Sequence, residues 1–312
     1  MIFNLNHRSI IEISGTDRYD FLQGLITNDI VKSRDSLIYS AMLSPKGRFL
    51  FDFFIFEFNQ ILILDCPKSR SEEILKKLNF YKLRKNIDIK INENWLILQN
   101  TDDIDYQKSL SNHRYFSFKD PRSNKLGDRI YLTNEEKNKF LSYDNNTNHY
   151  HYLRIINKIT EGEFDLTYDK SIIAEFNFDN LNAIDYKKGC YVGQELTART
   201  HYLGTIRKKL FYCQIKNAEE FYQNTAKTLV AETLIAQTLI AQTLIAYKNQ
   251  EIKVLLDAKE FDIGIALSSI QYNNSQHLLV LLDCENSEDK NFYEKIMNNP
   301  IYLNNKILKI IN

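Results

Sequence analysis

The sequence predicts an α+β fold that ends in a small β-barrel or sandwich. Strand-like and helix-like stretches mix through residues 1–209 without the regular strand–helix alternation of a parallel sheet. From residue 210 onward strand-like runs dominate, which is typical of a small all-β domain. At 312 residues the chain is too long for one ordinary core and suits two or three domains. We therefore predict two regions, 1–209 and 210–312.

The first region is expected to begin with a strand and a short helix. Residues 9–13 have the composition of a strand, and Asp17 is a candidate N-cap for the helix that follows. Two further strands, 36–43 and 48–57, are joined by Ser-Pro-Lys-Gly at 44–47, which has the composition of a four-residue turn. After these we expect a strand at 60–65, a helix at 69–78 and short strands at 87–91 and 95–99.

Residues 101–150 are polar and give few structural signals. Residues 228–246, in the second region, repeat every five residues, which matches neither the helical period of about 3.6 nor the strand period of about 2. This pattern predicts a low-complexity insertion at about 217–250 in a surface loop, and we assign it no chemistry. The expected strands of the second region are 211–215, 252–256, 263–268 and 278–283.

The composition excludes several classes of protein. Acidic and basic residues balance, 40 against 40, which argues against the broad basic surface of a nucleic-acid-binding protein. The apolar runs are too short to cross a membrane, and the first residues lack the pattern of a secretory signal or an Arg-rich transit peptide. The four cysteines are scattered without a Cys-x-x-Cys pair, which suits a reducing compartment. We expect a cytoplasmic protein without nucleic-acid or membrane partners.

Glycine is scarce, and its distribution points to Cys190. Three of the nine glycines in the chain fall between residues 189 and 204, and two of them, Gly189 and Gly193, bracket Cys190. This spacing predicts a sharp turn that presents the cysteine. The neighbouring Lys187 and Lys188, with an expected helix at 192–199, favour a reactive thiolate. A buried cysteine that fills a small gap is the alternative from these residues alone.

The segment from Lys188 to Glu195 resembles the K-G-C-[FY]-x-G-Q-E signature of the YgfZ family, a branch of the aminomethyltransferase superfamily that is linked to iron–sulfur proteins. The resemblance extends to two N-terminal blocks, 15–29 and 44–52, and to 263–269 near the end. It implies two α+β subdomains and a C-terminal β-barrel around a central opening that holds tetrahydrofolate. It also implies an accessory role in maturing or maintaining iron–sulfur proteins, including those that modify tRNA.

The family resemblance makes Cys190 the leading functional residue, as a nucleophile or redox group. Lys188 is expected to hold the thiolate, and Gly189 and Gly193 to shape the turn. A permanently bound metal is not expected, because a resident cluster needs about four thiolates. Three residues either orient the loop or a ligand or belong to a plain network on a helix face, namely Gln194, Glu195 and Arg199.

The predicted folate site rests on weaker signals. Asp52 matches by position an aspartate that the superfamily places near the reactive folate nitrogens, and an acid in an apolar strand either lines a pocket or faces outward. Asn28 and Arg48 are expected in the same pocket. The glutamate by which glycine-cleavage T-proteins hold the pterin is replaced by Ile156, and Glu161 substitutes for it only if the loop is shifted. A folate-dependent aminomethyl or methyl transferase and an RNA-binding module remain the alternative functions.

Overall fold

The computed structural model describes residues 1–102, 115–133, 143–204, 206–215, 247–256, 259–285, 291–299, 301–304 and 306–311. Of the predicted insertion at about 217–250, residues 217–246, which include the repeat at 228–246, lie outside the described residues. The chain forms two compact units. The first comprises Met1–Thr147, Thr167–Ala174 and Phe178–Gly204, and the second comprises Asn148–Leu166, Glu175–Asn177 and Thr205–Asn312. The predicted division at 209/210 stays a prediction.

The first unit contains two antiparallel sheets. One has five strands in the order β3-β4-β5-β2-β6, and the other has four in the order β1-β7-β9-β8. The strands of the five-stranded sheet are β2 (Arg8–Ser14), β3 (Ile38–Leu43), β4 (Phe49–Phe58), β5 (Ile61–Pro67) and β6 (Asp88–Asn92). The strands of the four-stranded sheet are β1 (Ile2–Asn4), β7 (Trp95–Asn100), β8 (Tyr115–Lys119) and β9 (Asp128–Thr133).

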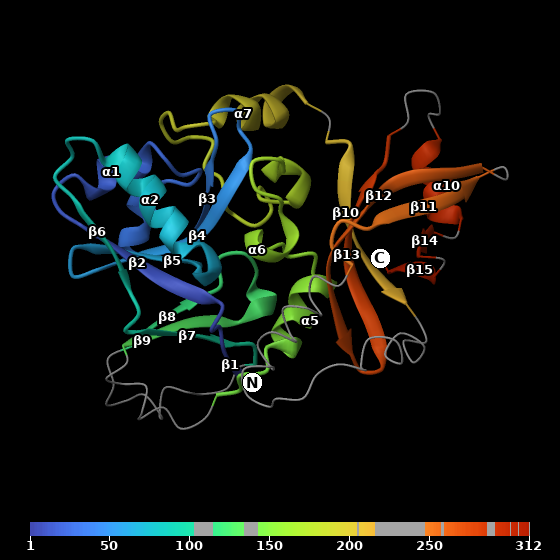
Figure 1. Ribbon diagram of the computed structural model, residues 1–312, viewed down its shortest axis with the longest axis horizontal. Coiled ribbons are helices and arrows are strands. Elements are labelled where there is room, and N and C mark those ends of the chain that lie inside the picture. The colour runs from blue at the N-terminus through green and yellow to red at the C-terminus, as the bar shows by residue number, and fades with distance from the viewer. Residues whose placement is uncertain are drawn as a thin grey trace. The chain divides into compact units, whose positions relative to one another are not determined.

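Strand β4 joins two layers because its side chains alternate between the faces of the sheet. Phe51, Phe53 and Ile55 pack with α1 (Arg18–Gln23) and α2 (Ser71–Lys82), which cover one face (Figure 1). On the opposite face Phe56 contacts aromatic rings of β7, β8 and β9. The four-stranded sheet therefore covers the second face of the five-stranded sheet.

Most of the expected elements of the first unit are present. The predicted helix at 69–78 corresponds to α2, and the predicted helix after Cys190 corresponds to α7 (Gln194–Leu203). Residues 101–150 were expected to lack signals, yet they supply β8 and β9. The described chain also contains four short 3₁₀ helices, at Ile30–Arg34, Lys68–Arg70, Asn124–Leu126 and Ile173–Phe176.

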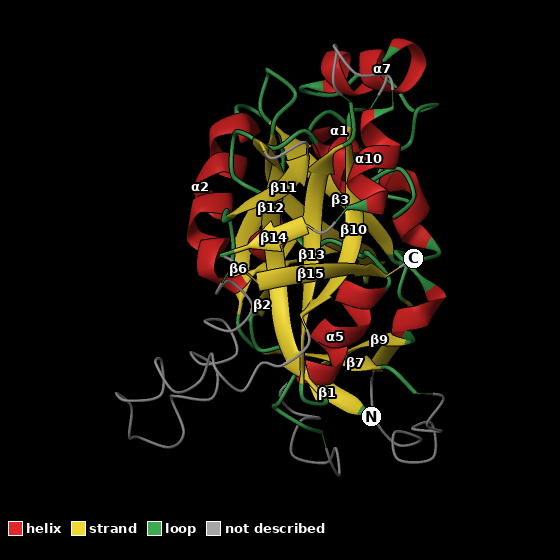
Figure 2. Ribbon diagram, turned by 90° about the vertical axis from the view of Figure 1, so that its right-hand side faces the viewer, coloured by secondary structure: helices red, strands yellow, loops and turns green. Residues whose placement is uncertain are grey.

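The second unit is built on a closed six-stranded barrel in the order β10-β13-β12-β11-β14-β15 (Figure 2). Pairing of β10 with β15 closes it and leaves no open edge. Its strands are β10 (Lys208–Ile215), β11 (Glu251–Leu256), β12 (Lys259–Tyr272), β13 (Ser275–Asp283), β14 (Ile301–Leu303) and β15 (Lys306–Ile311). Helix α5 (Asn148–Ile156) packs on β12 and β13, and the remaining helices are α6 (Gly162–Asp165) and α10 (Phe292–Asn298).

His277, on β13, is held by two hydrogen bonds inside this unit. Its Nδ1 lies 2.7 Å from the Tyr212 hydroxyl, and its Nε2 lies 3.1 Å from the carbonyl oxygen of Tyr272. Because a carbonyl can only accept, Nε2 carries the proton and Nδ1 accepts from Tyr212. Burial lowers the pKa of His277 below its ordinary value of 6.5.

We expect the barrel unit to lose stability as the pH falls below about 6.5. The unfolded chain takes up a proton at the ordinary pKa of histidine, whereas the folded imidazole does so only at lower pH, so acid favours unfolding. Well above pH 6.5 His277 is neutral in both states and contributes no pH dependence. Urea unfolding at about pH 5.5 and about pH 7.5 should show a smaller acid-induced loss for His277→Gln than for wild type. Equal losses would contradict the assignment.

Candidate functional site

The sulfur of Cys190 lies at the surface of the first unit. Of the four cysteines in the chain, all of which the structure describes, Cys66, Cys213 and Cys284 are buried and only Cys190 is exposed. Cys190 lines a cavity of about 190 Å³ together with Lys188, Tyr186, Tyr191 and Tyr202. The alternative of a buried gap-filling cysteine is therefore wrong, and the thiol is accessible to a partner.

Residues 185–193 form the bend that carries Cys190, called here the Cys190 bend, and Gly193 shapes its end. It is the N-cap of α7 and has a φ of 82°, a conformation that side chains rarely adopt. A Cβ at this position would lie 2.4 Å from the carbonyl oxygen of Ser44. Gly47, also with positive φ, is equally close, since its Cβ would lie 2.6 Å from the Cβ of Leu196. The 44–47 turn and the start of α7 therefore pack backbone to backbone.

Gly189 does not have the steric role that its position suggested. A Cβ at residue 189 would meet nothing within 4 Å, and the residue is not among those with positive φ. The expectation that both glycines shape the turn therefore finds steric support at Gly193 but not at Gly189. The bend is instead held by Gly193 and by polar contacts of its other residues.

Lys188 ties the bend to the turn that follows α1. Its Nζ donates to three carbonyl oxygens, those of Gln23 at 2.8 Å, Ile26 at 2.7 Å and Asn28 at 2.9 Å. An ammonium group has three N–H donors, and these three acceptors use them all. The predicted hydrogen-bonding partner, the Cys190 thiolate, is therefore replaced by main-chain carbonyls.

Asp185 begins the bend and was missed by the sequence reasoning. Its Oδ1 accepts from the backbone N–H of Lys187 at 2.7 Å and of Lys188 at 3.2 Å. Its Oδ2 lies 2.7 Å from the Nζ of Lys32. The hydrogen bond from Lys32 holds the pKa of the Asp185 carboxyl below its ordinary value. An Asp two residues before the lysine pair is the composition of an Asx-turn, and this signal could have identified it.

The helix residues of the motif divide into two groups. The Oε1 of Gln194 accepts from the backbone N–H of Tyr191 at 3.0 Å, so Gln194 orients the loop. Glu195 and Arg199 are exposed on α7, one turn apart. Their position leaves them accessible to a partner that approaches Cys190.

Aromatic side chains line one side of the Cys190 cavity. The rings of Tyr186 and His201 stack with centroids 3.7 Å apart, and the Tyr186 hydroxyl donates to Asp179. Asp179 also lies 3.7 Å from the Nδ1 of His201. Burial and this carboxylate raise the pKa of Tyr186. Tyr186, Tyr191 and the exposed Tyr202 line the cavity and give it an aromatic wall beside the thiol, and His201 supports the ring of Tyr186.

The residues predicted to bind folate in the first unit are largely engaged within the protein. The Nδ2 of Asn28 donates to the carbonyl oxygens of Tyr39 at 2.9 Å and Asn182 at 2.8 Å. The Nη1 of Arg48 donates to the carbonyl oxygen of Lys170 at 2.9 Å. Asp52 is fully buried and accepts from the Tyr39 hydroxyl at 3.0 Å. The outward-facing alternative for Asp52 is therefore wrong.

Asp52 lies beside a buried cluster of charges between the two sheets. The Nη1 of Arg8 is 3.7 Å from Asp52, and its Nε is 2.7 Å from Asp65. Asp65 also accepts from the Nε of Arg129 at 2.8 Å and from the Tyr131 hydroxyl at 3.0 Å. Although burial alone would raise it, the charges of Arg129 and Arg8 hold the pKa of Asp65 below its ordinary value.

Glu161, the candidate replacement for the pterin-binding glutamate, is buried in the second unit. Its Oε2 accepts from the Tyr150 hydroxyl at 2.6 Å and lies 3.8 Å from the Nε of Arg154. Asp165 accepts from Arg154 at 2.6 Å and from the backbone N–H of Glu161 at 2.8 Å. The two carboxylates of the predicted folate set, Asp52 and Glu161, are therefore both buried and hydrogen-bonded within their own units.

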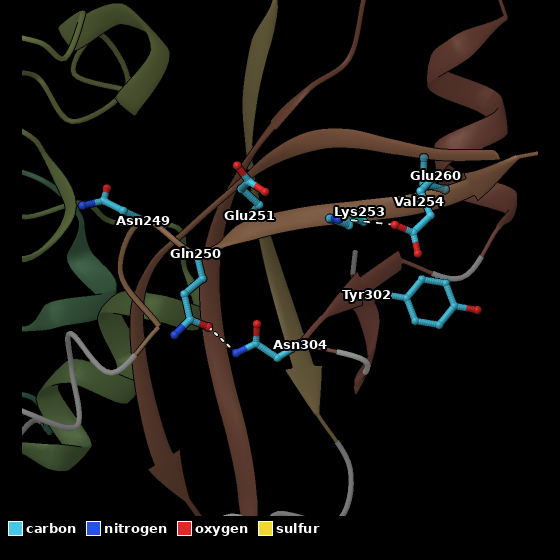
Figure 3. Close-up of a pocket in the computed structure, with 8 residues that line it drawn as sticks. All are labelled: Asn249, Gln250, Glu251, Lys253, Val254, Glu260, Tyr302 and Asn304. Carbon is cyan, nitrogen blue, oxygen red and sulfur yellow. Dashed lines mark hydrogen bonds and ion pairs between the residues drawn. The ribbon is translucent and has the colours of Figure 1, made fainter.

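A second concave surface lies on the barrel (Figure 3). Its cavity, of about 600 Å³, is lined mainly by polar side chains from β11 and the chain around it. Lys253 pairs with Glu260 at 3.3 Å, and Gln250 accepts from Asn304 at 2.8 Å. None of the predicted site residues lines it. Among the described residues, no group of three or more potential ligands is placed to hold a metal ion.

Comparison with curated proteins finds iron–sulfur cluster assembly factors among the relatives of this chain, although no family model matches. The chain is 32% identical over 249 residues to the mitochondrial iron–sulfur cluster assembly factor IBA57 homolog of Dictyostelium discoideum, 30% over 217 residues to that of Pyricularia oryzae, and 29% over 236 residues to human IBA57. These alignments cover 66%, 67% and 67% of this chain, and 60%, 56% and 65% of the relatives. The chain thus spans less than two thirds of the length of these relatives.

A solved structure confirms the predicted fold class. The glycine cleavage system aminomethyltransferase T from Bartonella henselae matches with a TM-score of 0.65 over 100% of this chain and 84% of its own, at 11% identity. At that identity the match speaks to the fold alone. The resemblance to the YgfZ family therefore holds at the level of the wider group, and the relatives by sequence are IBA57 factors.

The comparisons overturn the expected location. The relatives are named as mitochondrial proteins, so the prediction of a cytoplasmic protein is wrong. Scattered cysteines indicate only a reducing environment, which does not single out the cytosol. No helix in the described part of the chain is long and apolar enough to span a membrane.

Proposed function

We propose, from its similarity to the IBA57 iron–sulfur cluster assembly factors and from its aminomethyltransferase fold, that this chain assists the maturation or maintenance of iron–sulfur proteins and acts through Cys190. Its partners are the iron–sulfur assembly machinery or the client proteins themselves. Support for tRNA modification follows indirectly, through modifying enzymes that contain such clusters. The expected absence of direct nucleic-acid and membrane partners stays a prediction.

The exposed thiol of Cys190 is the observation that supports this proposal. Cys190 lies in a cavity at the surface, beside a fixed cation and an aromatic wall. The other cysteines are unsuited to the role, since burial raises the pKa of Cys213 to about 12 and that of Cys284 to about 11. A thiolate is the ligand that iron–sulfur clusters use.

A single exposed thiol favours a transient contact over permanent binding. A cluster held by one chain requires about four thiolates. The other three cysteines of the chain are buried, so Cys190 has no exposed thiol of the same chain to join it. In the proposed role the iron or cluster is cargo. Cys190 supplies one ligand while the partner supplies the others, and the cargo leaves with the partner.

We do not extend the proposal to aminomethyl transfer. The fold is that of an aminomethyltransferase, but Asp52 and Glu161 are buried and hydrogen-bonded within the protein. We therefore expect no tight tetrahydrofolate binding through these two carboxylates. Calorimetric titration with tetrahydrofolate should give the same weak or absent heat for wild type and for Asp52→Asn. Tight binding that the substitution abolishes would restore the folate site.

Loss of the Cys190 thiol should abolish the proposed function. A host strain that lacks its own gene of this kind would be complemented with wild type, Cys190→Ser or Lys187→Gln, a neighbouring exposed position. We expect activity of an iron–sulfur dehydratase to fall to the empty-vector level only with Cys190→Ser, while a dehydrogenase without a cluster is unaffected. Full complementation by Cys190→Ser, at equal protein level, would refute the role of this thiol.

A further inference from the structure

Lys188 donates all three of its N–H groups to main-chain carbonyls, and the proposed function does not use these contacts. We infer that Lys188 is a positioning residue, whose ammonium group caps the turn after α1 and thereby fixes the bend that presents Cys190. This inference deepens the proposed function and rests on it for its biological meaning. The claim that the ammonium group of Lys188 fixes the bend rests only on contacts within the first unit.

The three acceptors of Lys188 come from one short turn. Helix α1 ends at Gln23, and the carbonyls of Gln23, Ile26 and Asn28 all point at the same nitrogen, at 2.7 to 2.9 Å. Carbonyls at a helix end lack partners within the helix and carry partial negative charge. The partly buried ammonium group of Lys188 satisfies all three carbonyls at once, which a neutral or smaller side chain cannot do.

Two main-chain hydrogen bonds attach the bend to the same turn on either side of Lys188. The N–H of Asp185 donates to the carbonyl oxygen of Thr27, and the N–H of Val192 donates to that of Gly24, each at 3.0 Å. Lys188 therefore supplies the attachment in the middle of the bend. Gly189, the next residue, has open space around it and gives no steric support.

Two opposing effects act on the charge of Lys188. Burial lowers the pKa of Lys188 to about 8, against the opposing effect of the carboxylates of Asp29 and Asp185. The ring of Tyr191 lies 5.1 Å from the nitrogen and adds a cation–π contact. At neutral pH the side chain therefore keeps the three protons that the three carbonyls require.

Hydrogen exchange on the full-length chain tests this role. In Lys188→Ala we expect the backbone amides of residues 186–192 to exchange faster by about tenfold or more, because hydrogen bonds to a charged group are lost. Exchange in the barrel unit should not change. Lys187→Ala, which removes the exposed neighbouring lysine, should leave residues 186–192 at the wild-type rate.

Chemical rescue separates positioning from simple loss of charge or packing. Propylammonium, which replaces the missing stem and its three N–H donors, should slow the exchange of Lys188→Ala towards wild type. Tetramethylammonium, which has the charge but no donor, should not. Unchanged exchange in the variant, or equal rescue by both cations, would overturn the inference.

A second variant keeps the test decisive if Lys188→Ala does not fold. Lys188→Met retains the apolar stem without the ammonium group and should show the same local acceleration of exchange.

The exchange results do not depend on cluster assembly. If Cys190→Ser complements fully while exchange behaves as expected, the proposed function fails and the positioning role stands.

Discussion

Asp65→Asn is expected to destabilise the first unit by about 3–5 kcal/mol, which is the typical cost of removing one partner from a buried ion pair. Asp65 is fully buried and receives hydrogen bonds from Arg8, Arg129 and Tyr131. The amide keeps the size of the carboxyl but loses its charge. Two buried guanidinium groups then lose the carboxylate that they share, and Asp52, 3.7 Å from Arg8, keeps the other nearby negative charge.

The partly exposed pair of Arg70 and Glu73 provides the matched control. Its side chains are 27% and 46% exposed, and its shortest distance of 2.6 Å is close to that of the buried pairs. Because exposed pairs contribute little, Glu73→Gln should cost less than about 1 kcal/mol. Urea unfolding of both variants measures the difference. A cost for Asp65→Asn as small as that of the control would show that the buried cluster does not hold the two sheets together.

Gly193→Ala should cost at least about 2–3 kcal/mol and should also disturb the Cys190 bend. The new Cβ would lie 2.4 Å from the carbonyl oxygen of Ser44 and 2.9 Å from the Cβ of Leu43, and the φ of 82° adds backbone strain. The nearest obstacles include main chain, so a side-chain rotation cannot relieve the contact. The start of α7 must move away from the 44–47 turn.

Gly189→Ala tests whether this effect is specific to Gly193. The substitution is chemically identical and lies four residues away in the same bend, but its Cβ meets open space. We expect a change within about 1 kcal/mol and normal complementation. Thermal unfolding of the two variants compares them directly. If Gly189→Ala were the more damaging of the two, our account of how the bend is shaped would be wrong.

Local sequence signals were sufficient for much of the fold. The turn chemistry of 44–47 and the apolar spacing of 69–78 predicted a hairpin and a helix that the structure contains. Strands β8 and β9 were missed because each is short and lies in a polar stretch, where the alternating pattern is weak. They form because the second face of the five-stranded sheet carries Phe54 and Phe56, which would be exposed to water without a second sheet to cover them.

The motif located the candidate site but not its contacts. The sequence singled out Cys190, Gly193 and Lys188, yet the acceptors of Lys188 lie about 160 residues earlier in the chain. Proximity in sequence suggested the thiolate as the partner of Lys188, and only the folded chain reveals the three carbonyls. An acid at position 52, within an apolar strand, likewise indicated that its side chain needs a partner. That the partners are Tyr39 and Arg8 could not be predicted, because it depends on how the strands pair.

Cys190 is expected to be the one cysteine that presents a reactive sulfur to partners, and thiol labelling of the native protein measures this. Treatment of the folded chain with a maleimide, followed by intact and peptide mass spectrometry, should give one adduct per chain, at Cys190. Cys66, Cys213 and Cys284 should react only after denaturation, because they are buried. Native labelling that spares Cys190, or that reaches the buried cysteines at a similar rate, would contradict the account.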